Sequence, residues 1–293
     1  MRSWMRRARM PPRDLPSARE ARLGAELRKL REQAGKAAHE AAAWIGTDRA
    51  KMSNIESGRR GISETRIRRL TEFYGCRDQR LVGELCAMAR EHRGGNWWDA
   101  FRGKVPQGNV DMAELEHHST ALRMVHLLLV PGVFQTPQYA RAVMAGSVPP
   151  PDEELLAARV AVRLRRGELL RGENPPRCQA IIHEGALRMR YGGRATARGQ
   201  LEWLLEVTEW PSVELRVIPF SQEDVPGHGQ SFLYAYGPVR ELDTVEVDTP
   251  FGGDFLHGAD ELEKYRRLLE VSEKIALDEG ESRQLIQFIA REM

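Results

Sequence analysis

Residues 47–60, TDRAKMSNIESGRR, constrain the fold of this chain more than any other stretch. Asp48 can cap a short helix through its side-chain oxygen. Met52 and Ile55 are three residues apart, so they form an apolar stripe on one side of such a helix. The stretch therefore predicts a helix over residues 48–56 that buries one face and exposes the others.

The remaining faces of this helix carry Arg49, Lys51 and Asn54, whose side chains hydrogen-bond to base edges or phosphates. Gly58 supplies a stop directly after the helix. A basic first turn with an amide side chain, on a short helix, is what insertion into the DNA major groove requires. We therefore interpret the stretch as the recognition helix of a helix-turn-helix, which predicts a DNA-binding regulator.

The distribution of charge agrees with that interpretation. The net charge of +2 combines residues 1–94, with 22 Lys and Arg against 12 Asp and Glu (+10), and residues 95–293, with 22 against 30 (−8). Chance clustering of arginines is the alternative, but the basic part coincides with the predicted recognition helix. We expect the first part to meet an anion and the second part not to.

The first 17 residues are a basic leader with five arginines in the segment MRSWMRRARMPPR. They are expected to be disordered, or to belong to an over-extended start. A flexible arm over DNA phosphates is the alternative. No apolar run approaches the roughly 20 residues that a membrane span needs, so no membrane association is expected.

The cysteines favour a reducing compartment, and hence a cytoplasmic protein. There are three, an odd number, and they lack the spacing of metal ligands: Cys76, Cys86 and Cys178. This pattern argues against a disulfide scaffold.

Apolar periodicity predicts a mostly α-helical domain over residues 18–92, built from five helices. These are expected at 18–35, 37–45, 48–56, 63–74 and 78–92. Arg93-Gly94-Gly95-Asn96 follows as a linker. A compact domain of short helices fits the helix-turn-helix interpretation.

Residues 96–293 are expected to form an α+β domain with a small, largely antiparallel sheet. Strands are expected at 178–183, 213–218, 231–236 and 242–248. Helices are expected near 111–122, 137–145, 152–170, 184–191, 196–209, 260–277 and 281–291. The last of these follows Gly280. An apolar run from Val125 to Val130 is stopped by Pro131-Gly132.

Two resemblances extend this interpretation. Residues 23–60 resemble the lambda-repressor-like, XRE-type helix-turn-helix family. The later segments resemble the C-terminal domain of the WhiJ-type, or Scr1-like, antitoxin-like transcriptional regulators of actinobacteria. They are LEHHSTALR (115–123), VPGVFQTPQYARAVM (130–144), RRGELLR (165–171), HEGALRMRYGG (183–193), QLEWLL (200–205), VELRVIPF (213–220) and GQSFL (229–233).

The resemblance implies a two-domain cytoplasmic protein that binds double-stranded DNA, with a small cognate protein encoded nearby as a possible partner. It places three residues at base-reading positions, Arg49, Ala50 and Asn54. Lys51 and Ser53 are implied to face the DNA backbone.

The resemblance also implies that Arg59 and Arg60, after the helix, contact phosphate. A solvated turn is the alternative for these two arginines. Arg31 and Glu56 match a family pair that forms a partly buried ion pair. That pair would tie the recognition helix to its scaffold.

The second helix departs from the family pattern. Relatives open it with Leu-Ser-Gln, where this chain has Lys36, Ala37 and Ala38, and Ala41 replaces a later core leucine. Less apolar burial, at roughly 25 cal/mol per Å², predicts a less stable domain. The missing glutamine removes one expected phosphate contact, and the charge of Asp48 lies near the expected phosphate. A domain that no longer binds DNA tightly is therefore an alternative.

We identify no catalytic, cofactor-binding or metal-binding set, and we expect no enzyme activity and no cofactor. Adjacent His117 and His118 point about 100° apart on a helix, so they seldom share one ion with His126. His183-Glu184 lacks the second histidine of HExxH, and Gly227-His228-Gly229 lacks a strand-then-helix context. Cys178 is expected to be a buried thiol, and Trp97, Trp98, Trp203 and Trp210 to be core or interface residues.

The primary hypothesis is a homodimeric, sequence-specific transcriptional regulator that is modulated through its C-terminal domain. One alternative is a protein-interaction module that binds the small cognate protein, with weak or lost DNA binding; the acidic balance of residues 95–293 motivates it. The other alternative is a regulator that senses a small molecule.

Overall fold

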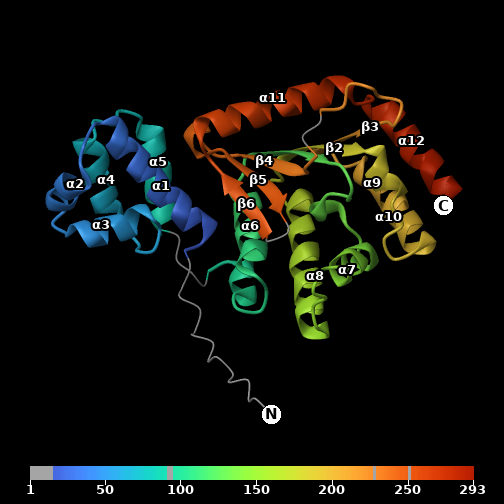
Figure 1. Ribbon diagram of the computed structural model, residues 1–293, viewed down its shortest axis with the longest axis horizontal. Helices are drawn as coiled ribbons and strands as arrows, with labels where there is room; N and C mark the ends of the chain where they lie inside the picture. The colour runs from blue at the N-terminus through green and yellow to red at the C-terminus, as the bar shows by residue number, and fades with distance from the viewer. Residues whose placement is uncertain (1–15, 91–94, 227–228, 250–251) are drawn as a thin grey trace, which may run out of the picture. The chain divides into compact units, whose positions relative to one another are not determined.

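The computed structural model describes residues 16–90, 95–226, 229–249 and 252–293 (Figure 1). The chain divides into two compact units, Met1–Glu91 and His92–Met293. Most of the predicted leader, residues 1–15, lies outside the described residues, as do the first two residues of the predicted linker, Arg93 and Gly94.

Within the described residues, the first unit consists of five α-helices around one apolar core. They are α1 (Ala18–Gln33), α2 (Ala38–Trp44), α3 (Arg49–Glu56), α4 (Glu64–Phe73) and α5 (Gln79–Arg90). The centre of the core is made by Leu27, Met52, Ile67, Leu70 and Leu85, which are fully buried. The apolar face predicted for α3 is thus turned inward, and α1, α4 and α5 each turn one apolar face inward as well.

Ser17 belongs to this helical unit and not to the leader, where the sequence prediction placed it. Its hydroxyl accepts a hydrogen bond from the backbone N–H of Glu20, and the Glu20 carboxylate accepts one from the backbone N–H of Ser17. This reciprocal capping box satisfies two N–H groups at the start of α1. Ser17 itself is buried.

The second unit is α+β and contains a six-stranded mixed sheet in the order β3-β2-β1-β4-β5-β6. The strands are β1 (Ala121–His126), β2 (Arg177–His183), β3 (Val213–Ile218), β4 (Phe232–Tyr236), β5 (Thr244–Thr249) and β6 (Gly252–Leu256). The pairs β1–β2 and β2–β3 are parallel, whereas β1–β4, β4–β5 and β5–β6 are antiparallel. Antiparallel pairs are therefore in the majority, as the predicted fold class has it.

The helices of this unit are α6 (Gln107–His117), α7 (Pro137–Ala145), α8 (Glu153–Gly167), α9 (Glu184–Arg188), α10 (Arg194–Val207), α11 (Ala259–Ile275) and α12 (Glu279–Glu292). Short 3₁₀ turns lie at η1 (Trp97–Phe101), η2 (Gly132–Phe134), η3 (Glu168–Arg171) and η4 (Arg240–Leu242). Thr136 caps α7 with proline at its first position, as expected from the sequence.

Three expectations were wrong in this unit. The helix expected at 111–122 ends at His117, and Ala121–His126 forms β1 in the middle of the sheet. A strand covered on both faces is apolar without clear alternation, so its period did not reveal it. The edge strand β6 was also missed, because its sequence GGDFL begins with residues that are depleted in strands.

The third wrong expectation concerns Gly280. It lies inside α12 and does not precede that helix. The break between α11 and α12 is made instead by Asp278, whose carboxylate accepts from the backbone N–H of Glu281 at 2.8 Å. The Glu281 carboxylate accepts a hydrogen bond from the backbone N–H of Asp278, which completes a capping box.

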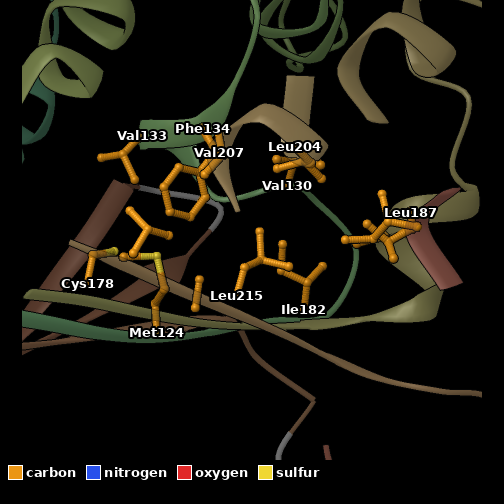
Figure 2. Close-up of a cluster of buried hydrophobic side chains, with 14 of the residues drawn as sticks. Met124, Val130, Val133, Phe134, Cys178, Ile182, Leu187, Leu204, Val207 and Leu215 are labelled. Carbon is orange, nitrogen blue, oxygen red and sulfur yellow. The ribbon is translucent and has the colours of Figure 1, made fainter. Parts of the chain in front are cut away.

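Helices cover both faces of the sheet (Figure 1). On one face, side chains from β1, β2 and β3 rise toward the η2 turn and α10, as Figure 2 shows for Met124, Cys178 and Leu215 below Phe134 and Leu204. On the other face α11 packs against a second apolar cluster. That cluster includes Val125, Ile181, Phe232, Val245, Leu262 and Leu269.

Candidate nucleic-acid interface

A tight turn joins α2 to α3. Gly46 has φ of +67°, a conformation that residues with a Cβ rarely adopt. Asp48 then caps α3, because its carboxylate accepts from the backbone N–H of Lys51 at 2.7 Å. The cap predicted from the sequence is therefore present, and it begins α3 directly after the turn.

The inward side of α3 is made by Met52 and Ile55, which are both buried. Their helix lies very close to α1 at Gly24. A Cβ built on Gly24 would stand 2.5 Å from the backbone oxygen of Ile55 and 2.7 Å from that of Glu56. The position admits glycine alone without displacement of the α3 backbone.

The outward side of α3 carries the residues that the resemblance assigned to base and backbone contacts. Arg49, Ala50, Lys51, Ser53 and Asn54 are all exposed. They occupy one short helix whose opposite face is fixed in the core. The structure thus brings the five residues together on one surface.

Lys51 already has an acidic partner on this surface. Its ammonium lies 2.8 Å from the second carboxylate oxygen of Asp48, and both side chains are about half exposed. The hydrogen bonds from Lys51 lower the pKa of the Asp48 carboxyl. Because exposed ion pairs are weak, a phosphate can compete for this lysine.

Arg31 and Glu56 form a bidentate ion pair between α1 and the end of α3. The Arg31 Nε donates to Glu56 Oε1 at 2.6 Å, and an Nη donates to Oε2 at 3.0 Å. A third bond runs from Arg31 to the backbone oxygen of Lys36 at 2.9 Å. The hydrogen bond to Glu56 raises the pKa of Arg31, against the opposing effect of burial. The guanidinium joins α1, the loop before α2 and α3 at one point.

Arg59 and Arg60 follow α3 and are exposed. The backbone N–H of Arg60 donates to the oxygen of Asn54 at 3.0 Å, which holds the turn against the helix. Gly58 has φ of +72°, and a Cβ there would meet the backbone of Ala21 at 2.6 Å. The turn therefore rests on α1, with both arginines directed away from the core.

In the atypical second helix, α2, other residues make contacts in place of the family residues that it lacks. Glu40 accepts from the backbone N–H of Ala37 at 2.7 Å and so supplies the start of α2. The Lys36 ammonium lies 5.0 Å from the ring centroid of Phe73. That ring stacks on Trp44 at 4.8 Å. Ala41 is completely buried in the same region.

Gly24 and the contact of Gly58 with α1 were not found from the sequence. A glycine inside a helix costs about 1 kcal/mol relative to alanine, so Gly24 in the middle of α1 was a signal of close packing. The partner across the contact is a backbone about 30 residues away in sequence. Only the folded chain identifies it.

The side chains considered for metal or catalysis lie elsewhere, in the second unit. His117 and His118 pack edge-on against Trp98, with ring centroids 4.9 and 6.0 Å away. Cys178 is buried in β2, which raises the pKa of its thiol. His183 Nδ1 accepts from the backbone N–H of Gly185 at 3.1 Å.

Trp203 and Trp210 pack edge to face at the apolar core of the second unit. Residues 227–228 of the considered Gly-His-Gly loop lie outside the described residues. In the part of the chain that the structure describes, no three His, Cys, Asp or Glu residues are grouped as a metal ion would require. The described helices also include none that is long and apolar enough to cross a membrane.

A family model described as a domain of unknown function, DUF5753, matches residues 110–287, which is more than half of the chain. The chain belongs to this family. A second model, described as a helix-turn-helix domain, matches residues 22–85 of this DUF5753 chain and includes α3. No curated protein and no solved structure matches it.

The helix-turn-helix match covers the ion pair, the close contact at Gly24 and the exposed face of α3. Helix-turn-helix domains place their second helix in the DNA major groove. This member of the DUF5753 family therefore carries a helix-turn-helix domain, which supports a DNA-binding regulator, ahead of its family domain.

Proposed function

We propose that this protein is a cytoplasmic, sequence-specific transcriptional regulator of the antitoxin-like WhiJ type, without enzyme activity. The observation that carries the proposal is the contrast between the two sides of α3. One side is fixed by Met52, Ile55 and the Arg31–Glu56 pair, while the other presents exposed polar side chains. A rigid support is what precise positioning in a groove requires.

In this proposal Arg49, Ala50 and Asn54 contact base edges. Arginine pairs with guanine, asparagine with adenine, and alanine with the thymine methyl group. Lys51 and Ser53 contact the DNA backbone beside them. Their exposure on the same side of α3 supports this assignment.

Arg59 and Arg60 contact phosphate at the end of the helix in the same proposal. Their attachment to α3 through the Arg60–Asn54 backbone bond supports a fixed distance from the base-reading residues. Phosphate contacts of this kind set the register of the domain on DNA.

The active form is proposed to be a homodimer that binds an imperfect inverted repeat. Two-fold symmetric proteins of this class place their recognition helices about one DNA turn apart. The DUF5753 domain is proposed to modulate DNA binding.

A second candidate function is capture of a small cognate protein by the second unit, with DNA binding secondary or lost. Residues 95–293 have a balance of −8, which favours a basic partner. Large apolar side chains are also exposed on that unit, including Leu128, Phe220 and Phe288.

The test is binding of the full chain to DNA from its own upstream region, against a scrambled duplex, over a salt series. A specific regulator prefers its site by about 10³ or more, and the preference survives physiological salt. Weak binding that ignores sequence and disappears with salt rejects specific regulation and favours the partner-binding function.

A further inference from the structure

The sheet face that packs against η2 and α10 carries titratable side chains toward its β5 side. The register pairs Met124 with Leu233 and Leu233 with Glu246, so these three side chains share one face. His126 and Asp248 lie two residues further along their strands and point the same way. Glu246 is buried, and the charges of Arg166 and Arg163 on α8 act on it.

One of these arginines is fully neutralised. Arg166 donates to both carboxylate oxygens of Glu116 on α6, at 2.7 and 2.6 Å, and both residues are buried. Burial alone would lower the pKa of Arg166, but the charge and hydrogen bonds of Glu116 outweigh it and the pKa is raised. This pair needs no further ligand.

Arg159 and Arg163 are different. They stand four residues apart on α8, where two side chains are neighbours, and like charges at this spacing repel. Among the described residues, neither has an ion pair. Arg163 donates to the neutral amide oxygen of Gln135 at 3.0 Å, and Arg159 to the hydroxyl of Ser147 at 3.5 Å.

Each of the two guanidiniums has a buried donor without an acceptor. The Nε atoms of Arg159 and Arg163 are inaccessible to solvent and have no hydrogen-bond partner, and the same holds for Nδ1 of His126. Burial lowers the pKa of Arg159, and burial followed by the charge of Arg166 lowers that of Arg163 to about 10. Such groups are unfavourable unless an acceptor meets them.

The backbone makes room for Arg163. A Cβ on Gly132 of the η2 turn would lie 3.1 to 3.2 Å from the Arg163 guanidinium and its Cδ. The turn thus packs flat against this side chain and holds it in place. As whole residues both arginines are partly exposed, although their Nε atoms are covered.

Acidic groups nearby do not cancel the charge of both arginines. Asp248 is exposed and its charge acts on Arg163 and His126. Burial, and then the charge of Asp248, raise the pKa of Glu246 to about 8, so this carboxyl is mostly protonated at neutral pH. Of the two arginines, the charge of Asp248 acts on Arg163, whereas burial alone shifts the pKa of Arg159, so the excess charge of the pair is positive.

We propose that Arg159 and Arg163, together with His126, form a binding site for a small oxyanion, a carboxylate or phosphate group of a metabolite. An oxyanion between the two guanidiniums supplies acceptors for both and removes their repulsion. The proposed function has the DUF5753 domain modulate DNA binding, and an oxyanion bound at this site is the ligand that does so. In that respect the inference rests on the proposed function. The binding event itself is independent of DNA.

The experiment is thermal unfolding of the full chain without DNA, titrated with inorganic phosphate or with malonate at constant ionic strength set by potassium chloride. The two probes separate a phosphate ligand from an organic acid. The variants are Arg163→Gln and Arg159→Gln, and the control is Arg198→Gln, which removes the same charge from an exposed pair with Glu202. Far-ultraviolet circular dichroism checks that each variant is folded.

The proposal expects a saturable increase in Tm with at least one probe. Affinity should fall about tenfold or more in both site variants, and remain unchanged in Arg198→Gln. Without any probe, Arg163→Gln should be at least as stable as the natural protein, because it removes an unpaired charge. If Arg163→Gln does not fold, Arg159→Gln decides the question.

Absence of a saturable increase with both probes overturns the proposal, as does an increase that both site variants retain. Because the assay contains no DNA, a failure to bind upstream DNA leaves its result unaffected. The two proposals therefore fail separately.

Discussion

The guanidinium of Arg31 donates two hydrogen bonds to the carboxylate of Glu56, at 2.6 and 3.0 Å, across 25 residues of sequence. Both side chains are about nine-tenths buried. The pair connects α1 to the last residue of α3, so the orientation of the exposed face of α3 depends on it.

Arg31→Ala should therefore destabilise the first unit by about 3 kcal/mol, because it leaves the Glu56 carboxylate buried without a partner. Arg28→Ala is the matched control. It breaks an exposed pair with Glu32 on the same helix and should cause no measurable change. Thermal unfolding of the full chain followed by circular dichroism compares them, and equal Tm values for the two variants would contradict the assigned role of the pair.

Gly24→Ala should destabilise the same unit and weaken specific DNA binding. The new methyl group would collide with the backbone oxygens of Ile55 and Glu56 and push α3 outward. Gly83→Ala in α5 is the control, since nothing lies within 4 Å of its Cβ position.

Alanine should stabilise α5 at that control position by up to about 1 kcal/mol. The two variants are compared by urea unfolding. If Gly24→Ala were also stabilising, the close approach of α1 and α3 would be wrong.

Arg49→Ala should relax the preference at one base pair and cost about 1–3 kcal/mol on the specific site, whereas Arg60→Ala should weaken binding to all sequences alike. The difference follows from base contact in one case and phosphate contact in the other. Binding titrations on the site, on single-base variants of it and on scrambled DNA measure both. Equal losses on specific and scrambled DNA for Arg49→Ala would refute its base-reading role.

Asp48→Asn should increase the affinity for DNA of any sequence. Asparagine caps a helix as well as aspartate does, so α3 keeps its start. The substitution removes a negative charge beside the expected phosphate and releases Lys51 from its ion pair. One further neutralised phosphate makes the salt dependence steeper by about 1 in log–log slope. An unchanged slope would show that Lys51 does not reach phosphate.

The buried carboxyl of Glu246 should make the second unit less stable as pH rises from about 6.5 to 8. Its pKa is raised to about 8 in the folded chain by burial and by Asp248, against about 4.3 when unfolded. At low pH the protonated Glu246 carboxyl contributes to the stability of the folded chain. This contribution is lost as pH rises through the pKa of the folded chain. The loss between 6.5 and 8 is at most about 2 kcal/mol.

The buried His126 acts in the opposite direction over a lower range, since its pKa is lowered to about 4 by burial. Its effect is complete above about pH 6.5, where the unfolded imidazole loses its proton. Glu246→Gln should therefore flatten the profile above that pH, while the exposed Glu263→Gln should leave it as in the natural protein. Urea unfolding at several pH values provides the comparison.

Much of the fold follows from local features of the sequence. Asp48 caps α3, Met52 and Ile55 are buried, and Thr136-Pro137 begins α7, all as expected. These features involve residues within one helical turn of each other. Their energies are similar in any chain that forms the helix.

The failures concern interactions between distant parts of the chain. Ala121–His126 is a strand because β2 and β4 lie beside it, and its own residues do not show that period. The edge strand has a glycine at position 253 because the Glu246 side chain on β5 occupies the space that a side chain of residue 253 would need.

The sequence by itself determined the helical class of the first unit, the cap and inward stripe of α3, and the α+β class of the second unit. Helix periods and caps are set by neighbours in sequence, so they can be recognised without a fold. The tertiary structure alone decided that Gly24 meets α3, that β1 is central, and that Arg163 packs against Gly132. It also decided that Arg159 and Arg163 have no ion pair among the residues that the structure describes. Close packing and desolvation depend on which distant groups come together, and that is a property of the folded chain.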